Sequence, residues 1–394
     1  MTKRITLDEA LLRWASPVQA QYLREINEGE YSSFRAYADS KGILHQSVTA
    51  ALRRLQTHAA VQGYSPAHDM THAVPDPFRM KGVSTYYDKD GKPRGQWVKS
   101  ALDHEKWRVH VVEAAAAMAE DLPRAEPVAF SKSEDVAPQL CNVYTLTDSH
   151  VGMLAWHKEG GADWDLKIAE ATLTKCFQAL IESAPRAGTC VVAQLGDFLH
   201  YDGLMPVTPT AGNVLDSDGR FAKMVEVSVR ILRHVVRAAL NRHEKVVVLM
   251  AEGNHDMAGA VWLRIMMKAL YENEPRVEVI DSEKPYYTHR HGAVMLAWHH
   301  GHLAKKESLP LSFAAEYPRL WGETTYRYCH TGHQHHIDEK EHPGMLVTQH
   351  PTLAARDAYA SRHGWSALRQ IMSVTYHDRY GQVSRNMVSP EMVE

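Results

Sequence analysis

The sequence has few cysteines and lacks the long features of membrane or secreted proteins. Its four cysteines are scattered, with neither a Cys-x-x-Cys pair nor the even framework of a secreted mini-domain, which indicates reduced core thiols. No stretch reaches the roughly 18 apolar residues of a membrane helix, and the N-terminus lacks the apolar run of a signal peptide. The sequence therefore predicts a cytoplasmic protein without membrane contact.

An excess of charge, internal repeats and ATP-binding motifs are absent as well. The net charge is only −3, so any contact with nucleic acid has to come from local patches. No repeat and no Walker phosphate loop appears, so nothing in the sequence indicates ATP use. Hydrophobic residues at 44% and charged residues at 23% exclude wholesale disorder, and 394 residues suggest two or three domains.

Five short motifs of aspartate, asparagine and histidine follow one another along the chain. Each alone is an ordinary polar loop, but the ordered set has the composition of a metal site. A pair of divalent ions roughly 3.5–4 Å apart needs about seven ligand atoms from imidazole, carboxylate and amide groups, with one bridging carboxylate. The set therefore predicts a two-metal site that cleaves phosphoesters. The motifs are Asp148-Ser149-His150, Gly196-Asp197, Gly253-Asn254-His255-Asp256, His299-His300-Gly301 and Gly332-His333-Gln334-His335.

Each motif also follows a β-prone run, and helical patterns separate the first runs. Ligand sites in α/β folds gather at the carboxyl ends of the strands, where loops converge. We therefore expect the five motifs to meet. The predicted strands include residues 143–146, 190–195, 246–250, 293–298 and 324–329, and amphipathic helices are expected around residues 166–180 and 221–232.

The ordered set resembles the calcineurin-like metallophosphoesterase superfamily over roughly residues 141–355. This resemblance implies an α/β (α+β) fold, a four-layer β-sandwich flanked by helices. It also implies two divalent ions, with Mn²⁺ expected and Mg²⁺, Fe²⁺ or Zn²⁺ as alternatives. By the same resemblance Asp148, His150 and His335 hold the first ion, Asp197 bridges, and Asn254, His300 and His333 hold the second.

Three histidines flank Gly301 and compete for one ligand place. The family ligand directly precedes the glycine, which favours His300, and His299 remains the alternative. The resemblance further implies a metal-bridging hydroxide as nucleophile and His255 as general acid. We expect Asp256 to orient His255 and to favour its protonated form.

A finer resemblance concerns the substrate. Gly196-Asp197-Phe198-Leu199-His200 is close to the Gly-Asp-Leu-Phe-His of double-strand-break-repair nucleases, which implies that His200 positions a DNA strand. The alternative is a histidine on the loop rim. Such nucleases usually work with an ATPase partner, and whether this chain has one stays open.

The N-terminal residues 1–66 resemble a helix-turn-helix DNA-binding module. Ala38, Gly42 and Val48 have the spacing at which a small residue lets two helices approach and glycine takes the turn. The alternative is a three-helix interaction or dimerisation domain. Such a module before a hydrolase resembles phage-encoded metallophosphoesterases. Candidate contacts to bases or phosphates are Gln46, Ser47, Thr49, Arg53 and Arg54.

The remaining sequence divides into three parts. Residues 67–119 read as a basic β-hairpin around Asp90-Gly91 followed by a helix, and suit either a nucleic-acid strand or packing on a neighbouring domain. Residues 120–140, with prolines and charges, read as a linker, and residues 141–394 as the metallophosphoesterase catalytic domain.

The leading hypothesis is a two-metal phosphodiesterase acting on DNA, either an exonuclease or an endonuclease or nickase. The first alternative is a phosphomonoesterase or protein phosphatase, since diester and monoester enzymes can share one metal set. The second is a DNA-binding regulator with a structural hydrolase domain. Cleavage polarity, sequence preference and a homodimeric state are left open.

Overall fold

The computed structural model describes residues 4–66, 70–71, 74, 78–90, 93–120, 122–130, 135–209 and 212–394. The chain forms two compact units, Met1–His110 and Val111–Glu394. The division into four parts made from the sequence stays a prediction, and each unit is described by itself.

The first unit begins with three helices whose ends follow from local side chains. Ser33 caps the second helix by accepting a hydrogen bond from the Ala36 N–H at 3.1 Å. Gly42 ends that helix with a left-handed φ of 64°, a conformation that glycine adopts without a Cβ clash. The elements are η1 (Glu9–Trp14), α1 (Pro17–Glu28), α2 (Phe34–Lys41) and α3 (His45–Val61).

The expected helices and glycine turn are therefore present, and Ala38 and Val48 are both buried where α2 meets α3. A small apolar cluster holds the three helices together, with α3 contributing one face and leaving the other exposed. The cluster consists of Ile26, Tyr37, Ala38, Val48 and Leu52.

A long two-stranded ribbon follows, as the Asp-Gly signal predicts. Strands β3 (Phe78–Tyr87) and β4 (Pro93–Leu102) pair antiparallel, and residues 91–92 at the turn lie outside the described residues. Tyr86 and Trp97 on the ribbon are exposed. The other elements are β1 (Tyr64–Ser65), its antiparallel partner β2 (Met70–Thr71), and α4 (His104–Glu120).

The second unit contains two sheets. The larger has the order β15-β14-β5-β6-β7-β8, in which β5 to β8 are parallel. The smaller has the order β12-β13-β11-β10-β9, with β10, β11 and β13 parallel. The strands are β5 (Ala137–Leu146), β6 (Ala187–Leu195), β7 (Lys245–Ala251), β8 (Val277–Val279), β9 (Tyr287–His291), β10 (Val294–Trp298), β11 (Tyr326–Thr331), β12 (Asp338–His342), β13 (Met345–Gln349), β14 (Ile371–His377) and β15 (Gly381–Val388).

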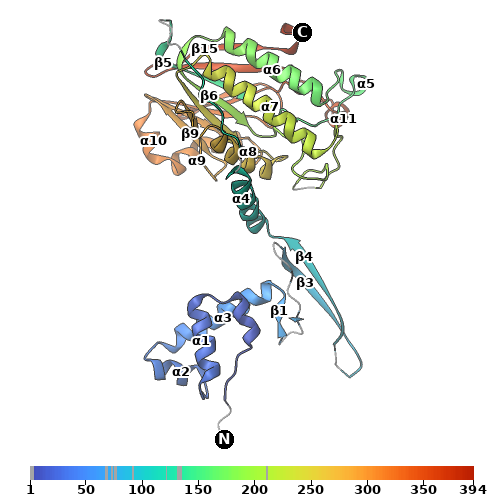
Figure 1. Ribbon diagram of the computed structural model, residues 1–394, viewed down its shortest axis with the longest axis vertical. Helices are drawn as coiled ribbons and strands as arrows, with labels where there is room; N and C mark the ends of the chain where they lie inside the picture. The colour runs from blue at the N-terminus through green and yellow to red at the C-terminus, as the bar shows by residue number, and fades with distance from the viewer. Residues whose placement is uncertain are drawn as a thin grey trace. The chain divides into compact units, whose positions relative to one another are not determined.

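Helices cover the outer face of each sheet. Figure 1 shows α6 and α7 side by side on one side of the sheets, and α9 and α10 on the other. The helices are α5 (His157–Gly160), α6 (Leu166–Ser183), α7 (Phe221–Leu240), α8 (Met257–Leu270), α9 (Leu309–Glu316), α10 (Pro318–Glu323) and α11 (Ala358–Arg362), with short turns η3 (Lys306–Ser308) and η4 (Pro390–Met392).

Alternation along the strands builds these layers. On β7, Val248 packs toward the core shared with α6, α7 and α8, whereas Val247 and Leu249 pack between the sheets. On β10, Trp298 faces the larger sheet and Met295 faces the core shared with α9. The four-layer β-sandwich flanked by helices is therefore confirmed.

Part of the predicted linker packs on the core of the second unit, to which it belongs. The Ala125 N–H donates to the Leu270 carbonyl at 2.7 Å, and Arg124 forms an ion pair with Glu272 at 2.7 Å. Ala125 and Val128 also pack on the core beneath α8. These residues therefore belong to the packing of this unit.

Two remaining expectations concern the cysteines and the membrane. The four cysteines are free and buried, in agreement with core thiols. Within the described ranges, no helix combines the length and apolarity needed to span a bilayer.

Candidate metal centre

All five motifs lie just beyond the ends of parallel strands. Asp148, Asp197 and Asn254 follow β5, β6 and β7 of the larger sheet, while His300 and His333 follow β10 and β11 of the smaller one. Backbone hydrogen bonds tie these loops together: the Asp148 N–H donates to Gly196 O at 3.1 Å, and the Gly332 N–H to His300 O at 2.8 Å. The expected convergence of the motifs is therefore present.

The backbone is strained at this convergence. Among the described residues, positive φ outside glycine occurs only at five positions, and all five are predicted metal ligands. Non-glycine residues avoid this region for steric reasons, and such strain persists only where the surrounding structure enforces it, often at functional sites. The residues are Asp148 (50°), His150 (42°), Asp197 (49°), His333 (72°) and His335 (61°).

The first group of potential ligands consists of Asp148, His150 and His335, whose ligand atoms all lie within 4.8 Å of one another. His335 Nε2 is 3.2 Å from Asp148 Oδ1 and 3.3 Å from His150 Nε2. The Asp148 carboxylate is fully buried and accepts hydrogen bonds from Thr147 Oγ1 at 2.6 Å and from the His333 N–H.

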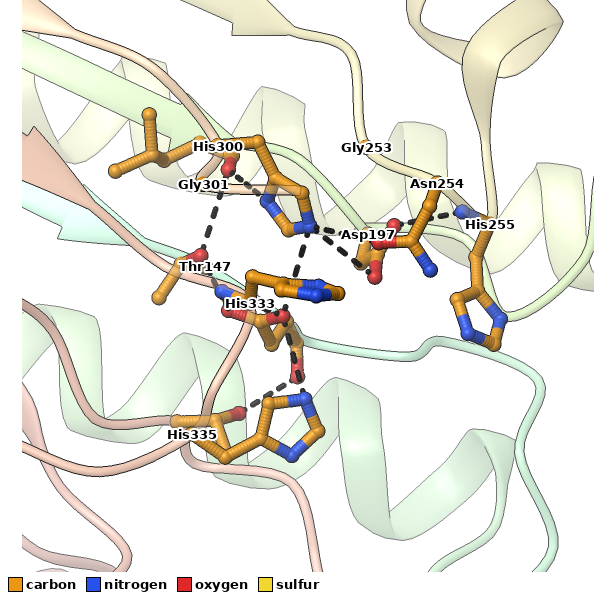
Figure 2. Close-up of polar contacts among 12 residues, drawn as sticks. Thr147, Asp197, Gly253, Asn254, His255, His300, Gly301, His333 and His335 are labelled. Atoms are coloured by element: carbon orange, nitrogen blue, oxygen red, sulfur yellow. Dashed lines mark hydrogen bonds and ion pairs between the residues drawn. The ribbon is translucent and has the colours of Figure 1, made fainter. Parts of the chain in front are cut away.

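The second group consists of Asp197, His300 and His333. His300 Nε2 lies 3.3 Å from Asp197 Oδ2 and 3.3 Å from Asn254 Oδ1, and Figure 2 shows these side chains turned toward one another. His300 Nε2 is also 4.0 Å from Asp148 Oδ1, so the two groups are adjacent. The imidazole, carboxylate and amide donors fit divalent transition-metal ions.

Both carboxylates are held ionised by imidazoles. Burial alone would raise the pKa of Asp148, but His335 and His300 hold that pKa below its usual range. Burial likewise opposes charge on Asp197, and His300 keeps the Asp197 pKa far below normal. Burial disfavours the protonated form of His300, yet Asp197 and Asp148 raise its pKa to about 10. Without metal, protonated imidazoles thus balance the two carboxylates.

His299 lies outside both groups. Its Nδ1 accepts a hydrogen bond from the Gly301 N–H at 3.0 Å, and its ring packs 5.0 Å from the Tyr286 ring. The structure therefore places His300 among the candidate ligands and His299 beside them.

His255 lies next to the first group, with its ring centroid 4.8 Å from that of His150. Its Nδ1 is 2.8 Å from the backbone carbonyl oxygen of His200, which can only accept, so Nδ1 carries a proton. The His255 N–H also donates to Asp197 Oδ1 at 2.8 Å, which ties this residue to the predicted bridging ligand.

Asp256 differs from the expectation that it orients the His255 ring. Its carboxylate is fully buried and accepts hydrogen bonds from four backbone N–H groups, because it lies beneath two of the metal-site loops. The ring of His255 is held by a carbonyl oxygen instead. Asp256 therefore positions the loops of Asp197 and Gly253. The donors are Asp197, Phe198, Leu199 and Gly253, at 2.8–3.1 Å.

His200 is neither on the rim nor open to solvent, since its exposed fraction is only 3%. Its ring stacks on His255 at 5.6 Å, and its Nδ1 lies 3.3 Å from His150 Nδ1. Burial, together with the neighbouring His255, lowers the pKa of His200 to about 3, so the ring is neutral. The structure therefore places His200 behind His150 and His255, where it supports them.

Two threonines that the motifs did not identify hold Asp148. Thr147 Oγ1 donates to the carboxylate, and Thr352 Oγ1 donates to the Asp148 backbone carbonyl at 2.6 Å. Because Thr147 directly precedes Asp148, its contact with the carboxylate could have been expected from the sequence. Thr352 lies 204 residues away, so nothing in the sequence indicates its contact.

The predicted nucleic-acid contacts all lie in the first unit, on α3. They share its exposed face, opposite the apolar side that carries Val48 and Leu52. The five residues are Gln46, Ser47, Thr49, Arg53 and Arg54.

No protein-family model matches this sequence, and no curated protein matches it either. Solved structures that resemble it include a novel archaeal phosphodiesterase, 12% identical at TM-score 0.32, covering 63% of this chain and 99% of its own. Vacuolar protein sorting 29 from Cryptosporidium parvum is 14% identical at TM-score 0.26, covering 63% and 97%. At these scores the likeness carries no argument about activity, which rests on the site itself.

The first prediction concerns Gly253. A Cβ there would lie 2.1 Å from Asp197 Oδ1 and 2.2 Å from the Asp197 backbone nitrogen, so both the carboxylate and its loop have to move in Gly253→Ala. We expect metal affinity, measured by titration, to fall about ten-fold or more. The control is Gly322→Ala in α10, where an added Cβ meets nothing within 4 Å. Unchanged affinity in Gly253→Ala would contradict this account.

The second prediction concerns protons. Ligating imidazoles must be deprotonated, and the carboxylates raise the pKa of both His300 and His335. Binding of Mn²⁺ at pH 7 should therefore release about one to two protons, and affinity should weaken as pH falls. Calorimetry in buffers of different ionisation enthalpy measures the release, and binding without protons would refute it.

Proposed function

We propose that this protein is a metal-dependent phosphodiesterase of the calcineurin-like metallophosphoesterase type, and that its substrate is DNA. The observation that supports this most is that two adjacent groups of histidine and aspartate lie where the strands of two packed sheets end. The backbone is strained at five of these candidate ligands. Structural loops do not require five left-handed aspartates and histidines at one place.

In this proposal Asp148, His150 and His335 would hold one ion, Asn254, His300 and His333 would hold the other, and Asp197 would be available to both. When bound, such ions polarise the phosphoryl oxygens and activate a water as the nucleophile. The chain itself fixes the ligands. Thr147, Asp256 and the glycines of the motifs hold the loops so that the carboxylates stay in place.

We assign proton delivery to His255. Since its Nδ1–H is bonded to the His200 carbonyl, a second proton on Nε2 can pass to the departing alkoxide oxygen as the P–O bond breaks. His200 supports this ring by stacking and, being neutral and buried, adds no charge of its own. Asp256 contributes indirectly, through the loop that carries His255.

DNA as the substrate is supported by the first unit. The turn at Gly42 and the buried pair Ala38 and Val48 give α2 and α3 the packing of a helix-turn-helix. The exposed face of α3 carries amide, hydroxyl and guanidinium groups, which suit base edges and phosphates. The chain's small net charge makes such a local surface necessary.

The third prediction tests the reaction. Manganese-loaded protein is incubated with supercoiled plasmid, linear duplex, single-stranded DNA, RNA, and chromogenic phosphate mono- and diesters. We expect DNA cleavage that Asp197→Ala abolishes. His255→Asn should bind metal normally but lose turnover about 10²–10³-fold, because the asparagine amide cannot donate a proton to the leaving oxygen.

Hydrolysis of monoester with every nucleic acid left intact would move the protein to the phosphatases. Normal turnover by metal-replete His255→Asn would contradict only the assignment of His255 as the proton donor. Metal content is measured on each variant, so that a lost ligand is not mistaken for a lost acid.

The fourth prediction tests the DNA surface in the full chain. If Arg53 contacts a phosphate, Arg53→Ala should weaken duplex binding and reduce the slope of log affinity against log salt by about 0.9. Arg24→Ala, an exposed arginine on α1, is the matched control. Binding is measured by fluorescence anisotropy without metal, and equal slopes for both variants would argue against this contact.

A further inference from the structure

A cavity of about 310 Å³ lies beside the candidate metal centre. Residues 301–306, after β10, form one side. Residues 331–334, at the end of β11 and just after it, form another, with Gln349 at the end of β13. His333 belongs both to the cavity lining and to the group with Asp197 and His300. Whatever fills the cavity therefore lies directly next to the candidate metal centre.

Three polar atoms of the lining residues lack a hydrogen-bond partner among the described residues: Thr331 Oγ1, His302 Nδ1 and Gln349 Oε1. Thr331 and Gln349 are 1% and 0% exposed, so both side chains are buried. Buried polar groups are normally paired, and leaving one unpaired costs about 1–3 kcal/mol. Their presence on the wall of a cavity points to a hydrogen-bonding ligand.

The amide of Gln349 has a fixed orientation. Its Nε2 donates to the backbone carbonyl of His336 at 2.7 Å, so Oε1 remains as an acceptor. An acceptor oxygen here selects ligand groups that donate, such as a sugar hydroxyl or an N–H of a base. Thr331 can either donate or accept beside it.

The charge of the lining residues also restricts which ligands suit the cavity. Lys305 and Lys306 line the cavity, and none of the lining residues is acidic. Lys306 is paired with Asp338 at 2.6 Å, whereas the exposed Lys305 ammonium has no ion pair among the described residues. The cavity is therefore suited to a ligand that carries a negative charge near Lys305.

We propose that this cavity binds the nucleotide adjacent to the scissile phosphate, with Gln349 and Thr331 contacting its sugar or base and Lys305 its other phosphate. Its volume is at the lower end of the range for small-ligand sites, about 300–1,000 Å³, which matches one nucleotide unit rather than a duplex segment. The inference rests on the proposed phosphodiesterase function and names a specificity subsite for it. Lys305 thereby becomes a specificity-determining residue outside the metal ligands.

The test compares dinucleotides of thymidine with and without an additional phosphate at the 5′ or the 3′ end. The wild-type protein, loaded with manganese, should prefer the phosphate-bearing dinucleotide in one of the two polarities. Lys305→Ala should reduce this preference, expressed as a ratio of kcat/KM values, about ten-fold and mainly through KM. Lys305→Arg should retain most of it.

Lys167→Ala is the matched control, because Lys167 is an exposed lysine of α6 in the same unit. Thermal melting of each variant checks folding. Equal preference in Lys305→Ala and Lys167→Ala, or a wild-type protein indifferent to the added phosphate, would overturn the subsite. Turnover of bis(p-nitrophenyl) phosphate distinguishes the two ways in which the proposal can fail. Diester hydrolysis without a preference for the added phosphate would contradict the subsite alone. No hydrolysis of any diester would contradict the phosphodiesterase proposal as well.

Discussion

The structure of the second unit depends on keeping two carboxylates, Asp148 and Asp197, ionised where almost no solvent reaches them. Their exposed fractions are 0% and 2%, and an unpaired charge at such a depth costs several kcal/mol. In this structure His300 and His335 supply the opposing charge. A pair of divalent cations would balance the two carboxylates more strongly. The same residues can therefore form ion pairs without metal and a metal centre with it.

The strained backbone lies at these same two carboxylates. Asp148 and Asp197 follow the neighbouring parallel strands β5 and β6, and both residues adopt left-handed conformations just after the strands end. Hydrogen bonds between the loops and the four N–H donors to Asp256 hold the turns. Gly253 and Gly332 are needed because a Cβ at either would lie about 2 Å from a neighbouring oxygen. The strain is thus maintained by the packing of two sheets.

The sequence was sufficient for the features that depend on local order. Motifs placed after β-prone runs predicted the convergence, and Gly42 between two helical patterns predicted the turn in the first unit. Features that depend on tertiary orientation were not accessible. The carboxylate of Asp256 reaches N–H groups 57 to 59 residues away, and only the fold determines that it turns there and not toward His255. The burial of His200 has the same origin, because a motif does not specify which side of a loop faces solvent.

A metal centre of this kind does not select its substrate. Its ions and imidazoles interact with a phosphoryl group that monoesters and diesters share, so discrimination has to come from surfaces that contact the rest of the substrate. Two such surfaces are present: the exposed face of α3 in the first unit, and the cavity lined by Lys305 and Gln349 in the second. In the roles proposed for them they differ in scale, since a recognition helix would read several base pairs and the cavity would hold one nucleotide. Under the proposed function, a chain with a small net charge would act selectively on nucleic acid, because one surface would select the molecule and the other would select the bond.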